Sequence, residues 1–236
     1  MAGSTIVNGV QINTGAHADR WLNATGEDAV VYENDFVEIP VSSDALPGWA
    51  TTLVETGAGQ STVTAAGTSG GALLLTTDAA DNDGINLQMA NAAFLPSATT
   101  GLYFGAAITL SEAAQSDIFI GLSVVNTAIL TNLPKRIGFR SVDGSASLTF
   151  DSEGTSETTV ENVGTLVDAT QIILEFVWDA GASAVRYYVD GDLQGTVELG
   201  GSLPDAALSP AIHFLTGAAS AETCAIDWIR VIQAGR

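Results

Sequence analysis

Short runs of apolar residues, separated by turn-forming residues, recur along most of this chain. Glycine, aspartate, asparagine, serine or proline stands in most of the gaps. Long stretches with apolar residues at helical spacing are absent, and the nearest candidate, SEAAQSD at 111–117, is short enough to be a loop or a single turn. The pattern therefore predicts many short strands. They are residues 29–39, 72–77, 84–89, 102–110, 118–125, 136–141, 147–151, 170–178, 184–189, 193–199 and 223–232.

Strands of this length and spacing are typical of an antiparallel sandwich or barrel. Local alternation favours two packed sheets, each of which hides one face of its strands. Val185, Tyr187 and Val189 share one face of their strand, while Arg186 and Tyr188 share the other. We therefore expect an all-β fold of two antiparallel sheets. In the last predicted strand, the same alternation predicts that Ile226 and Trp228 point to one face, with Asp227 and Ile229 opposite.

The first 28 residues depart from this pattern. The run STIVNGVQI, residues 4–12, predicts one short strand, and the stretch after it carries little pattern beyond Trp21. We interpret residues 1–28 as an N-terminal arm and residues 29–236 as a single sandwich domain, because neither a repeat nor a low-complexity linker divides the rest.

The charge of the chain limits its partners. Seven Lys and Arg against 27 Asp and Glu give a formal net charge of −20 at pH 7. This field repels nucleic acid and anionic membrane surfaces, and the longest apolar run is well short of the ~20 residues of a membrane-spanning helix. We therefore expect neither nucleic acid nor membrane as a partner. The single cysteine, Cys224, and the lack of a signal-peptide pattern are consistent with synthesis in a reducing cytosol.

The stretch VRYYVDGDLQGTV, residues 185–197, allows three interpretations: a calcium loop, an acidic catalytic centre, or a turn between strands. Asp190 and Gly191 between alternating strands predict a type I′ turn, which needs positive φ at both central positions. Calcium takes six or more oxygen ligands, and two carboxylates do not supply them. We favour the turn, with Asp192 at the start of the return strand.

A second metal candidate is the stretch DAADNDG at 78–84. Asp81 and Asp83 partly match a calcium loop, but the further ligands of that motif are missing. We favour a solvated turn, keep the two aspartates as weak metal candidates, and expect no cofactor.

A glycoside hydrolase needs two positioned carboxyl groups. The strand IILEFVW, residues 172–178, offers only Glu175, and an exposed strand edge explains Glu33 and Asp35 as well as catalysis does. His213 lies in a strand-like run and Cys224 alternates with apolar residues, so we predict that both are buried rather than reactive. On these residues we expect no enzyme.

Two tryptophans are candidates for stacking on a sugar ring. Trp49 lies in a predicted loop, and Trp178 ends a predicted strand. A hydrophobic plug is the alternative for each indole, and we favour it.

Several stretches together resemble known families. VDGDLQGTV (189–197) and AIDWIRVI (225–232) resemble the hairpin and closing strand of concanavalin A-like and laminin G-like jelly rolls. Residues 102–124, 136–150 and 209–232 are similar to tailed-bacteriophage virion proteins with this fold. The likeness spans about residues 35–232 and implies a concanavalin A-like jelly-roll sandwich.

The resemblance implies a non-enzymatic structural protein that decorates or cements a bacteriophage capsid. Its partner would be the major capsid protein, a homotrimer is expected, and the protein would be made in the host cytoplasm and reach the virion surface. The arm would supply the contacts through Ile6, Val7, Val10, Ile12 and Trp21. The alternative is a carbohydrate-binding module on a phage head or tail fibre, with a surface glycan held at Trp49 and Trp178.

Overall fold

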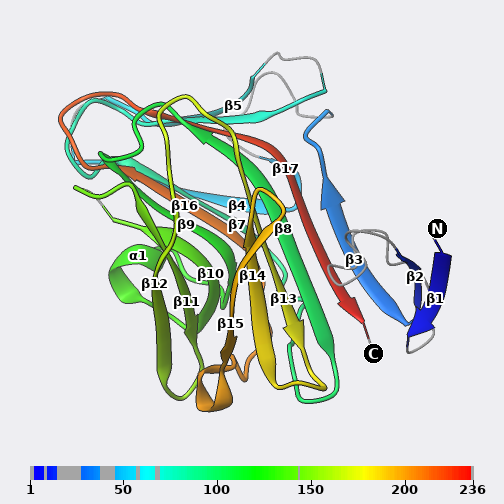
Figure 1. Cartoon of the computed structure of the whole chain (residues 1–236). Coiled ribbons are helices and arrows are strands. Elements are labelled where there is room, and N and C mark those ends of the chain that lie inside the picture. Colours follow the sequence, from blue (N-terminus) through cyan, green and yellow to red (C-terminus); the bar gives the residue numbers. More distant parts are fainter. Residues whose placement is uncertain are drawn as a thin grey trace.

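A computed structural model of the chain confirms the predicted all-β sandwich, with two antiparallel sheets packed face to face (Figure 1). The structure describes residues 3–7, 10–14, 28–37, 46–56, 59–66, 70–142 and 144–234. Within those residues, none of the helices is long and apolar enough to cross a membrane.

The first sheet has seven strands in the order β12-β11-β10-β9-β16-β7-β4. Their bounds are β4 (Trp49–Val54), β7 (Gly84–Met89), β9 (Ser116–Ser123), β10 (Arg136–Ser141), β11 (Ser147–Glu153), β12 (Glu157–Thr165) and β16 (Ser209–Thr216). A single helical turn, α1 (Ile129–Asn132), lies between β9 and β10 in the sequence and packs on the outer face of this sheet.

The second sheet has eight strands, with the order β15-β14-β13-β8-β17-β6-β5 and β3 paired to β17. Their bounds are β3 (Ala29–Asn34), β5 (Thr62–Ala65), β6 (Leu73–Thr76), β8 (Gly101–Leu110), β13 (Ile172–Asp179), β14 (Ala184–Val189), β15 (Asp192–Glu198) and β17 (Thr223–Ala234). A short 3-10 helix, η2 (Gly200–Ser202), follows β15.

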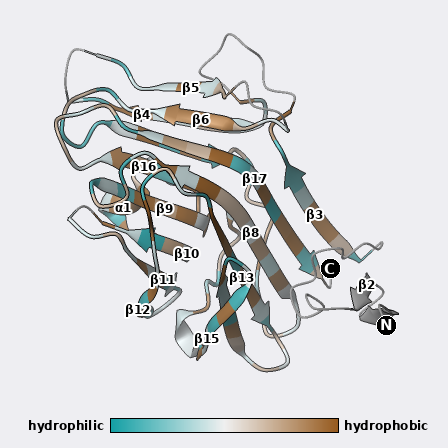
Figure 2. Cartoon of the chain, turned by 45° about the horizontal axis from the view of Figure 1, so that its top comes forward, coloured by the Kyte–Doolittle hydropathy of each residue, from teal (hydrophilic) through white to brown (hydrophobic). Residues whose placement is uncertain are grey.

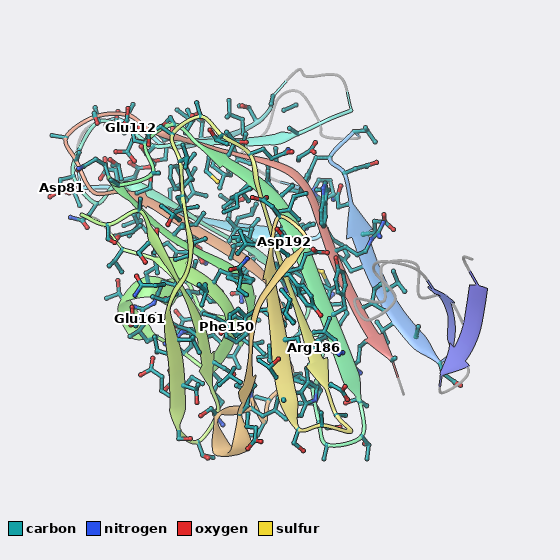
Figure 3. The ribbon with its side chains drawn as sticks, in the orientation of Figure 1. Asp81, Glu112, Phe150, Glu161, Arg186 and Asp192 are labelled. Carbon is teal, nitrogen blue, oxygen red and sulfur yellow. The ribbon has the colours of Figure 1, made fainter. Side chains whose placement is uncertain are left out.

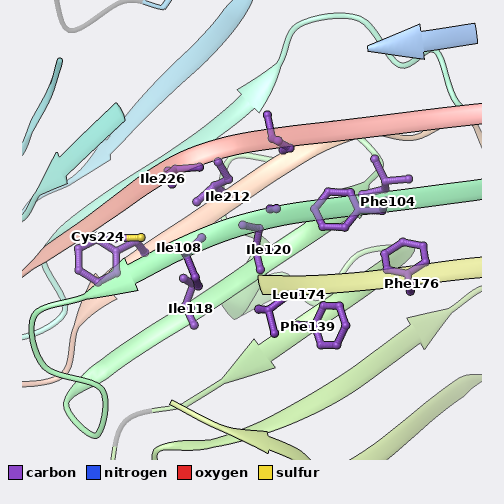
Figure 4. Close-up of a cluster of buried hydrophobic side chains, with 14 of the residues drawn as sticks. Phe104, Ile108, Ile118, Ile120, Phe139, Leu174, Phe176, Ile212, Cys224 and Ile226 are labelled. Carbon is purple, nitrogen blue, oxygen red and sulfur yellow. The ribbon is translucent and has the colours of Figure 1, made fainter. Parts of the chain in front are cut away.

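Hydrophobic residues recur along the strands of both sheets (Figure 2). Their side chains interdigitate in the core between the two sheets (Figure 4). Aromatic rings from both sheets meet there. Phe104 and Phe176 of the eight-stranded sheet stack with ring centroids 5.2 Å apart, and Phe150 of the other sheet meets Phe176 edge-on at 5.6 Å. Buried aromatic pairs contribute about 0.5–1.5 kcal/mol beyond their area, so this cluster helps to hold the sheets together.

The predicted hairpin turn is confirmed. Asp190 and Gly191 have φ values of 51° and 85°, both positive, as a type I′ turn requires. The Asp190 Oδ1 accepts a hydrogen bond from the backbone N–H of Ile173 at 2.8 Å. The carboxylate therefore ties the turn to β13.

The predicted alternation in β17 is wrong from Trp228 onward. The pairing of β17 with β8 shifts between Ile226 and Trp228, so Asp227 forms a bulge. A bulge adds one residue to one strand and reverses the side-chain alternation after it. Ile226 and Ile229 therefore both enter the core, while Trp228 lies half-buried on the outer face beside Gly105.

The N-terminal arm contains two strands rather than one. β1 (Gly3–Val7) and β2 (Val10–Thr14) pair as an antiparallel hairpin that belongs to neither sandwich sheet. The backbones of four predicted contact residues, Ile6, Val7, Val10 and Ile12, lie in this hairpin, whereas Trp21 lies outside the described residues. A role for the arm in partner binding, and the division at residue 28, stay predictions.

Candidate functional site

The outer face of the seven-stranded sheet carries a cluster of charged side chains. The pleat of β10 sends Ile137 and Phe139 into the core and Arg136 and Arg140 outward. Gly138 stands between the two arginines.

Three acidic side chains from the neighbouring strands complete this cluster. On β11, Asp151 and Glu153 point outward two residues apart, and Glu157 begins β12 directly opposite Glu153. We call these five residues the carboxylate cluster: Arg136, Arg140, Asp151, Glu153 and Glu157.

Arg136 is the centre of the carboxylate cluster. Its side chain is fully buried, and its guanidinium forms ion pairs with Glu153, with Glu157 and, at 3.4 Å, with Asp151. Arg140 Nε lies 2.6 Å from the same Asp151 carboxylate. Two positive and three negative groups leave a formal charge of 2 − 3 = −1. The cluster therefore offers negative charge to anything bound above it.

The two glutamates form the accessible edge of the carboxylate cluster. The side chain of Glu153 is 32% exposed and that of Glu157 is 46% exposed, whereas Arg136 and Asp151 are both 0% exposed. Because Glu153 and Glu157 bind the two terminal nitrogens of one guanidinium, their carboxyl groups lie side by side at the surface.

The turn between β11 and β12 is held in place by η2. The backbone N–H of Thr155 donates to the Gly201 carbonyl at 2.8 Å, and the hydroxyls of Ser156 and Ser202 are 3.0 Å apart. A Cβ added to Gly154 would lie 2.2 Å from the Leu203 carbonyl oxygen, so only glycine fits there. This contact fixes the ends of both strands, and with them Glu153 and Glu157, before any ligand arrives.

A small pocket of about 150 Å³ adjoins the carboxylate cluster along the same strands. Arg140, Thr149 and Glu161 contribute to its lining, together with serines from β10 and β11. Figure 3 shows Glu161 on β12, beside the strand that carries Phe150. A polar ligand seated at Glu153 and Glu157 can extend along this sheet toward the pocket.

Both candidate sugar-binding tryptophans lie in the core. Trp49 is 8% exposed and its indole N–H donates to the Tyr32 hydroxyl at 2.8 Å. Trp178 is 2% exposed and donates to the Ser97 carbonyl at 2.8 Å. Neither ring face is open in this conformation, so stacking on a sugar at either tryptophan stays a prediction.

The weak metal candidates hold a loop together. Asp83 is fully buried, and its Oδ1 accepts hydrogen bonds from the backbone N–H and hydroxyl of Thr56. Asp81 is exposed at one end of the sandwich (Figure 3), and its carbonyl accepts from the Thr56 hydroxyl at 3.2 Å. In the part of the chain that the structure describes, groups of three or more His, Cys, Asp or Glu that could hold a metal ion are absent.

The acidic residues weighed for catalysis fall in two places. Glu175 is buried on the outer face of the other sheet and accepts a hydrogen bond from the Tyr103 hydroxyl at 2.9 Å. Glu33 forms an ion pair with Arg230, and Asp35 follows the end of β3. Glu33 and Asp35 line one pocket of about 380 Å³, and Glu175 does not take part in that lining.

His213 and Cys224 are buried, in agreement with the sequence. Burial raises the pKa of the Cys224 thiol to about 12, so it is not a reactive thiolate at neutral pH. Burial also lowers the pKa of His213 to about 4, so its imidazole is neutral. His213 faces outward from β16 and is covered by α1 rather than by the core.

Sequence reasoning missed the carboxylate cluster, because its members come from three strands that become neighbours only in the sheet. One signal was present: Asp151 and Glu153 stand two apart at the end of a predicted strand, and Arg136 and Arg140 stand four apart in another. Spacing of two or four places side chains on one face of a strand. The pairing partner β12 was not predicted, since its residues are mostly polar.

Comparison with solved structures places the fold. The chain superposes on an endo-1,3-beta-glucanase from Streptomyces sioyaensis with a TM-score of 0.62 and 13% identity, over 90% of this chain and 99% of that one. A beta-glucanase from Bacillus licheniformis gives a TM-score of 0.57 and 13% identity, over 85% of this chain and 97% of that one. The chain has the fold of these glucanases.

An endo-beta-1,4-glucuronan lyase from Trichoderma reesei has the same fold. The superposition gives a TM-score of 0.57 and 12% identity, over 85% of this chain and 94% of the lyase. Searches of family models and of curated proteins found no match. Identities this low show the fold alone.

These matches correct the functional prediction. We predicted a non-enzymatic protein that decorates or cements a capsid, with a carbohydrate-binding module as the alternative. The named activities among these matching structures are those of glucanases and a glucuronan lyase, which contradicts the predicted non-enzymatic capsid protein. The resemblance of residues 35–232 was correct for the jelly roll and not for the virion role. The expected major capsid protein partner, homotrimer and virion location stay predictions.

Proposed function

We propose that the chain is a carbohydrate-active enzyme that hydrolyses a neutral polysaccharide, a β-glucan, at the carboxylate cluster. The supporting observation is the pair Glu153 and Glu157, two partly exposed carboxylates held side by side on one buried guanidinium. The substrate class is taken from the names of the matching glucanases.

The chemistry of the carboxylate cluster suits this reaction. Glycoside hydrolysis uses two carboxyl groups about 5–10 Å apart and passes through a transition state with positive charge on the sugar ring. The net negative cluster stabilises that developing charge. In the proposed reaction Glu157, the more exposed carboxyl, leaves its ion pair with Arg136, takes up a proton from solvent and gives that proton to the leaving oxygen. Glu153, oriented by Arg136, is placed to act on the opposite side of the bond.

Hydrolysis of a neutral glucan is favoured over eliminative cleavage of a uronan. Elimination removes a proton beside a carboxylate and builds negative charge, which the cluster would oppose. The chain also carries a net charge of −20, which repels an anionic polymer. Both charges therefore favour the neutral substrate.

The test is an assay of the full chain on soluble β-1,3- and mixed-linkage β-glucans, with release of reducing ends as the readout. Glu153→Gln and Glu157→Gln should each lower turnover by about 100-fold or more, since one positioned acid or base contributes ~10²–10⁴-fold. The matched control is Glu198→Gln on the exposed edge strand β15, which should keep full turnover.

Each variant needs a melting curve, so that loss of the ion pairs is separated from loss of chemistry. The proposal is wrong if the wild-type chain releases no reducing ends from any of these glucans. It is equally wrong if folded Glu153→Gln and Glu157→Gln variants keep wild-type turnover.

A further inference from the structure

A row of side chains leads away from the carboxylate cluster across the outer face of the same sheet. Asn86, His213, Phe119 and Arg140 are opposite one another on the adjacent strands β7, β16, β9 and β10. Strands lie about 4.8 Å apart, so the row is about 14 Å long. Its last member, Arg140, belongs to the carboxylate cluster.

Most of this row is covered by residues 124–133, which include α1; we call them the cover segment. Ile129 is fully buried and packs with Leu130 on Phe119 and Ala211. Its backbone N–H donates to His213 Nδ1 at 3.2 Å, and Asn86 Nδ2 donates to the Asn126 carbonyl at 2.9 Å.

Two buried polar atoms remain without a partner under the cover segment. They are His213 Nε2 and Asn86 Oδ1, on residues that are 1% and 2% exposed. Because Nδ1 accepts the Ile129 N–H, neutral His213 carries its proton on Nε2 and is a donor there. The Asn86 amide is oriented by its bond to Asn126, so Oδ1 is an acceptor. Buried polar groups are normally paired, so this pair of atoms needs an explanation.

His213 and Asn86 are opposite each other, so one ligand hydroxyl could accept from His213 Nε2–H and donate to Asn86 Oδ1. Phe119, opposite His213 on the other side, would offer its ring to the same ligand once Ile129 moves away. Hydroxyls that alternate with apolar C–H faces are the chemistry of a sugar. Water has the same hydroxyl chemistry but gains nothing from Phe119.

The cover segment contains little regular secondary structure. α1 has only four residues and no side-chain cap, and the residue that follows it, Leu133, adopts a left-handed conformation with φ 44°. That conformation is strained for a residue with a Cβ. Closure therefore combines backbone strain with two unpaired buried atoms, and both offset part of the stabilisation from buried Ile129 and from the hydrogen bonds between Gln88 and the segment.

We propose that the cover segment is a displaceable lid over a sugar-binding site formed by Asn86, His213 and Phe119, which extends the carboxylate cluster along the sheet. The inference rests on the proposed function for the identity of the sugar. A lid that occupies its own site lowers apparent affinity by the fraction of molecules that are closed. Loosening the lid should therefore raise affinity.

The experiment measures binding of a soluble β-1,3-gluco-oligosaccharide to the full chain by calorimetry, with amide hydrogen exchange of residues 124–133 as a second readout. Ile129→Ser removes the apolar plug and should bind at least about tenfold more tightly than wild type. Saturating oligosaccharide should speed exchange across the cover segment in wild type. Thr127→Ala, an exposed position of the same segment, is the control and should change neither.

The lid proposal is overturned if wild type and Ile129→Ser bind the oligosaccharide with equal affinity, or if neither protein binds it. So does unchanged exchange in the cover segment of the saturated protein, which would leave water as the occupant of the site. Lid-dependent binding without release of reducing ends would uphold the lid and reject the proposed hydrolysis, so the two failures are distinguishable.

Discussion

His213 couples stability to pH through one buried imidazole. Burial lowers its pKa from 6.5 to about 4, so the imidazole binds a proton less tightly in the folded protein than in the unfolded chain. The contribution of neutral His213 to stability is therefore fully present above pH 6.5 and is lost as pH falls toward 4 and below. The total loss is about 3 kcal/mol, from about 1.4 kcal/mol for each pKa unit.

Urea unfolding of wild type and His213→Gln at pH 7.5 and pH 4.5 checks this prediction. The wild type should lose more stability on acidification than the variant, because glutamine cannot take the proton. Equal losses in the two proteins would show that the imidazole is free to titrate in the fold.

Glu222 also couples stability to pH, but its folded-state pKa is shifted in the opposite direction from that of His213. Its side chain is 1% exposed, and Ser116 donates to its Oε2 at 2.8 Å. Desolvation raises the pKa of this carboxyl; hydrogen bonds from Ser116 and Thr216 lower it by less, and the nearby charges of Glu112 and Asp117 raise it further. The folded state therefore binds the proton more tightly than the unfolded chain does, and ionisation above the raised pKa costs stability.

Glu222→Gln should accordingly raise the free energy of unfolding at pH 7.5, and the gain should shrink as pH falls below the folded pKa. Denaturant titrations at several pH values measure it. Glu198→Gln, an exposed carboxylate, is the control and should show no such gain. A variant less stable than wild type at pH 7.5 would contradict the prediction.

At the scale of the element, β9 and β10 approach each other through a glycine pair. Gly121 and Gly138 are directly opposite, and a Cβ on Gly138 would lie 2.5 Å from the Ile120 carbonyl oxygen and 2.7 Å from the Gly121 Cα. Both are backbone atoms that cannot move aside cheaply.

Gly138→Ala should therefore destabilise the fold by about 2 kcal/mol or more, because overpacking forces the strands apart. Gly181→Ala, where the nearest atom is an Asp179 side-chain oxygen at 3.4 Å, should change stability little. Thermal or urea unfolding of the two variants gives the comparison, and similar stabilities would argue against the close approach of β9 and β10.

Most elements were predictable because their own residues determine them. The bounds of β7, β10 and β14 match the predicted runs at both ends, and positive φ at Asp190 and Gly191 follows from the residues of the turn. β12 was missed because an exposed edge strand lacks the apolar signal, and the bulge at Asp227 was missed because it is defined by pairing with β8.

The whole molecule carries a formal charge of −20, and its few cations are mostly paired. Repulsion among carboxylates therefore opposes the compact state more than ion pairs support it. Raising NaCl from about 0.01 M to about 0.15 M shortens the screening length from about 30 Å to about 8 Å.

The melting temperature should rise by about 3 °C over that range, the scale of a change near 1 kcal/mol. Differential scanning calorimetry measures it. A variant with exposed carboxylates neutralised at Asp81, Asp192 and Glu198 should show a smaller rise. A melting temperature that falls with salt would mean that attractive pairs dominate.

The sequence by itself determined the two-sheet jelly roll, most strand positions, the hairpin turn, and the burial of His213 and Cys224. These properties depend on alternation, turn chemistry and hydrophobicity, which act over a few residues. Only the tertiary structure decided where the carboxylate cluster forms, because Arg136, Glu153 and Glu157 lie on three separate strands, β10, β11 and β12, that become neighbours in the sheet. It also decided that the cover segment lies over His213, since that contact joins residues 84 positions apart.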